Sequence, residues 1–185
     1  MPRNSAAQKK AKREPARAPA EFSVHGPFSV PSRDKHIERT VQRTFWATSE
    51  LAGLATERGC YVFALVTRGG GIKPLYVGQT RGDFKGECFD YHKLVILNDG
   101  IRRQSGRLVL YLVKHEKSGH GRISGSDLTD LEHRLIGLAY KQNPNLLNVK
   151  GTKGRPPAVI RGIDKPHRGS PSDAEKDFKR LIGTR

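Results

Sequence analysis

The sequence has few cysteines, few acidic residues and no long apolar run. Its 185 residues include two cysteines, Cys60 and Cys88. Neither their number nor their spacing indicates a disulfide framework or a zinc site, so we expect two free thiols in a reducing compartment, cytoplasmic or nuclear, with cytoplasmic taken first. No apolar run approaches ~18 residues, which excludes a membrane-spanning helix. No apolar segment follows the basic residues of the N-terminus, so no secretory signal is expected.

The shortage of acidic residues leaves the chain strongly basic. There are 34 Lys and Arg residues against 18 Asp and Glu residues, a formal net charge of +16. Residues 1–33 carry a net charge of +5 and residues 149–185 a net charge of +6. A surplus of this size indicates a polyanionic partner, nucleic acid first and an anionic membrane surface second.

Composition divides the chain into a central region and two extensions. Residues 1–32 are rich in Ala, Pro, Lys and Arg without periodicity, which predicts a disordered basic tail. Such a tail can be a nucleic-acid arm, a solubility tail or a localisation signal. Residues 33–58 are predicted to form a helical extension, because apolar residues recur at helical spacing after Ser32, a potential cap. Residues 150–185 form a basic C-terminal extension, in which residues 171–182 can form a short helix.

The central region, residues 59–149, alternates strands with helices. Its apolar patterns predict the order strand, strand, helix, strand, helix, over residues 59–67, 74–79, 84–98, 107–114 and 127–141. The first and third strands are apolar on both faces, which predicts that both faces of their sheet are covered.

One carboxylate interrupts the apolar face of the last predicted helix. At about 100° per residue, Leu128, Leu131 and Leu135 lie in one arc, and Glu132 falls inside it. A buried, unpaired carboxylate is costly, so Glu132 needs a cation, a metal or a cleft. The structural alternative is an ion pair with Arg81 or Lys73.

Four short motifs, taken in order, resemble the GIY-YIG endonuclease family. They are Gly59-Cys60-Tyr61, Tyr76-Val77-Gly78-Gln79-Thr80, Leu131-Glu132-His133-Arg134-Leu135-Ile136 and Pro144-Asn145-Leu146-Leu147-Asn148. The resemblance covers residues 59–149. It implies an α+β fold, an α/β sandwich in which a small three-stranded antiparallel sheet is flanked by helices. It also implies hydrolysis of a phosphodiester in nucleic acid, DNA first, with one Mg²⁺ or Mn²⁺ ion.

The resemblance also implies a role for each matching residue. Glu132 would bind the metal, as a single carboxylate can when a hard cation keeps most of its waters. Tyr61 would take the proton from the attacking water, which requires a nearby cation because a free tyrosine has a pKa of about 10. Tyr76 would orient water or phosphate, and Asn148 would hold the metal helix or a tyrosine by a hydrogen bond. Gly78 would let substrate or backbone approach closely.

The chain departs from the family pattern at one expected cation. The family places an arginine about ten residues beyond the second tyrosine, where this chain has Gly86 or Glu87. Arg81 is the first substitute, because a guanidinium binds phosphate through two hydrogen bonds, and Lys85 is the second. Together with Gly78, Lys85 and Arg122 are the predicted nucleic-acid contacts.

Two other functions fit the same sequence. The missing arginine favours a non-catalytic nucleic-acid-binding module with a degenerate site, and the charge alone fits a basic scaffold or ribosome-associated protein. His92, His115, His120 and His133 show no metal-ligand spacing, and His133 lies outside the apolar arc of its helix.

Overall fold

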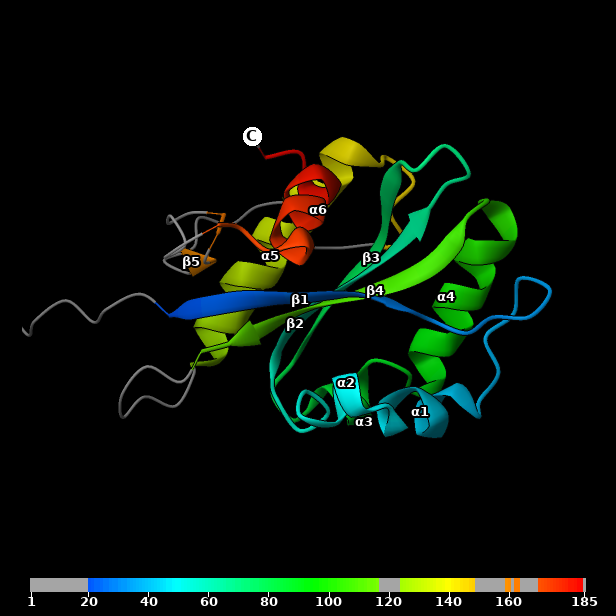
Figure 1. Ribbon diagram of the computed structural model, residues 1–185, viewed down its shortest axis with the longest axis horizontal. Coiled ribbons are helices and arrows are strands. Elements are labelled where there is room, and N and C mark those ends of the chain that lie inside the picture. Colours follow the sequence, from blue (N-terminus) through cyan, green and yellow to red (C-terminus); the bar gives the residue numbers. More distant parts are fainter. Residues whose placement is uncertain (1–19, 117–123, 149–158, 161, 164–169, 185) are drawn as a thin grey trace, which may run out of the picture.

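One sheet with the strand order β3-β2-β4-β1-β5 forms the centre of the fold (Figure 1). The computed structural model describes residues 20–116, 124–148, 159–160, 162–163 and 170–184. Neighbouring strands are antiparallel except β5, which joins β1 in parallel. The strands are β1 (Glu21–Ser29), β2 (Gly59–Val66), β3 (Ile72–Thr80), β4 (Arg107–His115) and β5 (Val159–Ile160).

Helices cover both faces of this sheet, so the predicted α+β class is confirmed. On one face lie α4 and the short helices before it, and on the other face lie α5 and α6 (Figure 1). Side chains of β2 alternate between the two cores: Tyr61 and Phe63 face α4, whereas Cys60 and Val62 face α5. The helices are α1 (Val41–Thr44), the 3-10 helix η1 (Phe45–Ala47), α2 (Ser49–Ala52), α3 (Phe84–Glu87), α4 (Tyr91–Arg103), α5 (Gly125–Gln142) and α6 (Asp173–Ile182).

The prediction of a disordered tail over residues 1–32 was wrong for its last part. Residues 21–29 form β1, with Phe22 and Val24 buried, so the sheet has more than the three predicted strands. The register of β1 against β4 shifts between His25 and Phe28. The two residues between them are Gly26 and Pro27, and this interruption of the alternating pattern is why the strand was not expected.

The single helix predicted over residues 33–58 was also wrong. Ile37, Val41 and Phe45 are buried, so their spacing identified the core residues correctly. The backbone, however, forms only α1, η1 and α2, and Thr48 between the last two is extended. The side chain of Asn98 accepts from the Ile37 N–H at 2.7 Å and donates to the Ile37 carbonyl at 3.2 Å, and it thereby holds this residue against α4.

Polar caps set the ends of the remaining helices. The helix predicted over residues 84–98 is divided into α3 and α4, because Asp90 accepts a hydrogen bond from the Lys93 N–H and begins a new helix. Ser124 forms a capping box at the start of α5. Ser172 does the same for α6, which confirms the short C-terminal helix.

Among the residues described, no helix has the length and apolarity needed to cross a bilayer.

Candidate active site

A cavity of about 340 Å³ lies beside β3, the edge strand of the sheet. It brings together Tyr76, Glu132 and Asn148, three of the predicted site residues, which come from β3, α5 and the segment after α5. The full lining is Tyr76, His92, Ile96, Glu132, His133, Ile136, Leu147 and Asn148. Residues more than 70 positions apart in sequence therefore meet because α4 and α5 cover opposite faces of the sheet and both reach its edge.

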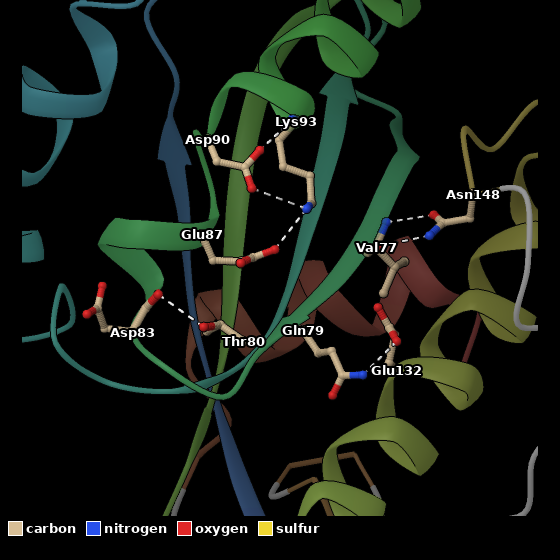
Figure 2. Close-up of polar contacts among 9 residues, drawn as sticks. All are labelled: Val77, Gln79, Thr80, Asp83, Glu87, Asp90, Lys93, Glu132 and Asn148. Carbon is tan, nitrogen blue, oxygen red and sulfur yellow. Dashed lines mark hydrogen bonds and ion pairs between the residues drawn. The ribbon is translucent and has the colours of Figure 1, made fainter.

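Glu132 lies half-buried in this cavity. Its Oε2 accepts a hydrogen bond from Gln79 Nε2 at 3.1 Å (Figure 2). The same nitrogen lies 3.3 Å from Thr129 Oγ1. Burial raises the pKa of Glu132 above its ordinary value, and His133, the Gln79 hydrogen bond and Lys93 oppose that rise. Within the described chain, Glu132 forms no ion pair with Arg81 or Lys73, the two cations that the structural alternative required. The carboxylate therefore faces a cavity rather than a counter-ion.

Asn148 is fixed by the backbone of the edge strand. Its Oδ1 accepts from the Val77 N–H at 2.8 Å, and its Nδ2 donates to the Val77 carbonyl at 2.7 Å (Figure 2). The preceding Leu147 N–H donates to the Leu75 carbonyl at 2.9 Å. The segment after α5 therefore pairs with β3 much as a further strand would, and this pairing places Asn148 at the cavity wall.

The two predicted tyrosines lie in different environments. Tyr76 lines the cavity, whereas Tyr61 is fully buried behind it, with the two ring centroids 6.4 Å apart. The Tyr61 hydroxyl is buried and has no hydrogen-bond partner among the described residues. Burial raises the pKa of Tyr61 well above that of a free tyrosine. Burial also raises the pKa of Tyr76, and Lys93 opposes this rise.

Gly78 explains why Tyr61 can occupy its buried position. Gly78 is opposite Tyr61 in the β2–β3 pairing, and a Cβ atom on Gly78 would lie 2.4 Å from the Tyr61 hydroxyl oxygen. Only glycine leaves room for the tyrosine ring at this position. Gly78 is itself buried and has a packing role against the Tyr61 ring, and its contact with nucleic acid stays a prediction.

Among the described residues, Lys93 is a cation beside Tyr76 and Glu132 that was not predicted. Its Nζ lies 2.8 Å from Glu87 Oε1 and 3.6 Å from Asp90 Oδ2 (Figure 2). Its charge opposes the rise that burial causes in the pKa of both Tyr76 and Glu132, which places it electrostatically within reach of both groups. The sequence feature that could have indicated this position is Asp90, a residue type that often caps helices. With Asp90 as the N-cap, α4 begins at Tyr91 and Lys93 lies in its first turn.

Neither predicted substitute for the missing arginine lines this cavity. The Arg81 guanidinium lies against Gly125, where an added Cβ would be 2.9 Å from Cζ. Gly125 precedes Glu132 by seven residues, which is roughly 10 Å along α5. Arg81 instead lines a second cavity, of about 560 Å³, with Gln79, Asp83 and Glu87. Lys85 is exposed on α3, and Arg122 lies outside the described residues.

Two histidines complete the cavity wall. His92 lies on α4 and His133 on α5, and neither was expected at the site. Their positions depend on how the two helices pack at the edge of β3, which local sequence does not show.

No group of three or more His, Cys, Asp or Glu residues in the described part of the chain is arranged to hold a metal. A metal at this cavity would therefore have Glu132 as its carboxylate ligand. That donor set fits a hard cation such as Mg²⁺, which retains several waters and needs one or two carboxylates.

Comparison with known proteins adds no relative from which a function could be transferred. No family model, no curated protein and no solved structure matches this chain.

Proposed function

We propose that the chain is a divalent-metal-dependent endonuclease that hydrolyses phosphodiesters of nucleic acid, DNA first, at the cavity beside β3. The observation that carries this proposal is the meeting of Tyr76, Glu132 and Asn148 in that cavity. These are the positions at which the chain resembles the GIY-YIG family. The net charge of +16 supplies attraction to a polyanionic substrate.

Glu132 would hold Mg²⁺ or Mn²⁺. A bound ion at this position would polarise the phosphate and stabilise the charge that develops during hydrolysis. Gln79 orients the Glu132 carboxylate by donating a hydrogen bond to one of its oxygens. The other carboxylate oxygen accepts no hydrogen bond in the described structure, so it is available for a cation.

The residues that line the cavity suggest which side chains orient the water or phosphate and which one accepts the proton. With its raised pKa, the Tyr76 hydroxyl stays protonated near neutral pH and can donate a hydrogen bond to water or phosphate. Tyr61 is a positioning residue here, because it packs behind Tyr76 and its own hydroxyl is buried. His92 and His133 line the cavity, and histidine is the side chain that most often accepts a proton in general base catalysis. We assign the proton acceptor for the attacking water to one of these two imidazoles.

A plasmid-nicking assay tests the proposal. We expect the wild-type chain to nick supercoiled DNA with Mg²⁺, and chelation to abolish nicking. We expect Glu132→Gln to be at least about 100-fold slower, because transition-state charge stabilisation of this kind is typically that large.

The matched control is Asp130→Asn, which removes another carboxylate of α5 two residues away and should nick like the wild type. Equal nicking by Glu132→Gln and the wild type would contradict the proposal and would indicate another site or a contaminant.

A second candidate function is a non-catalytic nucleic-acid-binding module. It is favoured by the pairing of Lys93 with Glu87 and Asp90, which partly neutralises this cation. This candidate predicts salt-sensitive binding without metal-dependent cleavage. Single-turnover cleavage by the wild type that exceeds the Glu132→Gln background would eliminate it.

A further inference from the structure

An exposed aromatic residue stands on the outer surface of α4. Tyr91 is 67% exposed and Val95 is 50% exposed, and Tyr91 is the most exposed large hydrophobic residue in the described part of the chain. The two residues are four positions apart and so lie on one stripe of the helix. A large ring with this exposure gains little from packing within its own chain.

One contact of the Tyr91 ring is already in place. The guanidinium carbon of Arg39 lies over the ring, 4.9 Å from its centroid. Arg39 is two residues from Ile37, whose backbone N–H and carbonyl are both held by Asn98 of α4. The Arg39–Tyr91 stack therefore rests on an anchored segment, and the exposed remainder of the ring is open to a further partner.

The Tyr91 stripe adjoins the cavity. His92 and Ile96, which line the cavity, follow Tyr91 and Val95 by one residue each. Successive residues of a helix are about 100° apart, so the two stripes are neighbours on the surface of α4. Arg102 lies three helical turns beyond Tyr91 on the same stripe and is exposed. A nucleic-acid strand that runs along α4 past the cavity would meet the ring at one end and a basic side chain farther along.

We infer that Tyr91, supported by Arg39, is a stacking platform for an unpaired nucleobase beside the cleavage site. The inference deepens the proposed function, because it names a nucleic-acid substrate with single-stranded character: a single strand, a loop or a flap. Exposed aromatic rings on basic surfaces bind single strands by stacking against bases, often with arginine. A base inside a duplex is stacked on both faces and cannot offer one to the ring without being extruded.

Charge favours a nucleic acid over a protein or a membrane as the occupant of this surface. The apolar part consists of Tyr91 and Val95, and the exposed Arg39, Arg102 and Arg103 lie on α4 or beside it. Arg103 is paired with Asp99, whereas Arg39 lies over the ring. Glu38, Asp90 and Asp99 are also nearby, but a small aromatic surface with Arg39 over its ring and Arg102 along the same stripe, on a chain of charge +16, is complementary to bases carried on a phosphate backbone.

Binding measurements in the Glu132→Gln background, with no divalent metal, test this inference without interference from cleavage. The probes are a fluorescein-labelled single-stranded oligonucleotide and the blunt duplex of the same sequence, followed by anisotropy. We expect Tyr91→Ala to weaken single-strand binding roughly 5- to 100-fold, the range typical of one lost base stack. Duplex binding should change less than about twofold, because its phosphate contacts remain.

Two further variants separate stacking from a general effect. Tyr91→Trp should retain single-strand affinity, and the emission of the introduced indole should be quenched by the single strand and not by the duplex. Tyr140→Ala removes an exposed tyrosine of α5 and should leave both affinities unchanged. Equal losses of Tyr91→Ala on both probes, or no loss on either, would overturn the inference.

The outcome is separable from that of the proposed function. If stacking fails, nicking by the wild type and its loss in Glu132→Gln are unaffected. If nicking fails, a single-strand preference that depends on Tyr91 still supports the platform and assigns it to a binding module.

Discussion

At the residue scale, the most informative side chain is Glu132. A carboxylate on the apolar side of a helix is predicted from spacing alone, and its meaning depends on what it faces. Glu132 accepts a hydrogen bond from Gln79 and lines a cavity that two imidazoles also line. In the part of the chain that the structure describes, it does not pair with Arg81 or Lys73, the two cations that the sequence offered. Burial without a paired cation raises its pKa, so its ionised form carries a cost that a bound metal would relieve.

This cost predicts how stability depends on pH. The pKa of Glu132 in the folded chain is raised above its ordinary value of 4.5, so the unfolded chain ionises it more easily. Stability from the protonated carboxyl is present below pH 4.5 and is lost as the pH rises through the folded pKa. Glu132→Gln replaces the ionisable carboxyl by a neutral amide, so the variant does not lose stability through ionisation at this position. We expect the variant to be more stable than the wild type in urea denaturation at neutral pH without metal.

The comparison needs a second pH and a second condition. The gain should shrink towards zero below pH 4.5, and saturating Mg²⁺ should stabilise the wild type and not the variant. A variant that is less stable at neutral pH would indicate that Glu132 has a counter-charge in the folded chain.

At the element scale, the edge of β3 is both a structural boundary and a wall of the site. The sheet ends at β3, and an open edge would leave backbone groups unpaired. The segment after α5 supplies their partners through Asn143, Leu147 and Asn148. Two of these three residues, Leu147 and Asn148, also line the cavity, so edge protection and site geometry share contacts.

Asn148→Ala should therefore reduce stability as well as any activity. It leaves both backbone groups of Val77 without their side-chain partners, which typically costs about 1–3 kcal/mol. Urea denaturation measures the loss, and hydrogen exchange should show faster exchange of the Val77 amide.

Asn145→Ala is the matched control for this substitution, because Asn145 is exposed in the same segment and should change stability by less than about 0.5 kcal/mol. If Asn148→Ala and Asn145→Ala have equal stability, the edge pairing contributes nothing and the role of Asn148 is confined to the cavity.

At the scale of the whole molecule, β1 makes part of the N-terminal region a strand of the sheet. It lies between β4 and β5, and its Phe22 is fully buried against the core that α5 and α6 share. The basic N-terminal residues before it add a net charge of +5 over residues 1–19. The N-terminal region thus contains a strand of the sheet as well as the basic residues 1–19. Composition alone had assigned both to one tail over residues 1–32.

Two truncations distinguish these parts. Deletion of residues 1–19 retains every described strand, so we expect a thermal midpoint close to that of the full chain and weaker, less salt-dependent binding to DNA. Deletion of residues 1–29 removes β1 and leaves β4 without one of its neighbours. This second deletion should abolish cooperative unfolding in circular dichroism. Cooperative unfolding of both truncated chains with the same midpoint would show that β1 is dispensable.

The sequence by itself determined the features that depend on local spacing. Strands β2, β3 and β4 follow from runs of β-branched and aromatic residues, and the inward position of Glu132 follows from the helical period. The short C-terminal helix α6 falls within residues 171–182, where the local sequence allowed a helix. Each of these depends on neighbours within a few positions, so local chemistry is sufficient to specify it.

Only the tertiary structure decided which groups meet. The break between α3 and α4 brought Lys93 close to Tyr76 and Glu132, while Arg81 was placed against Gly125. Strand register put Tyr61 over Gly78 and left Tyr76 at the cavity. The interrupted strand β1 and the segment around Ile37 acquired their conformations from partners on β4 and α4. These outcomes depend on register and helix packing between distant segments, which spacing along a single segment does not encode.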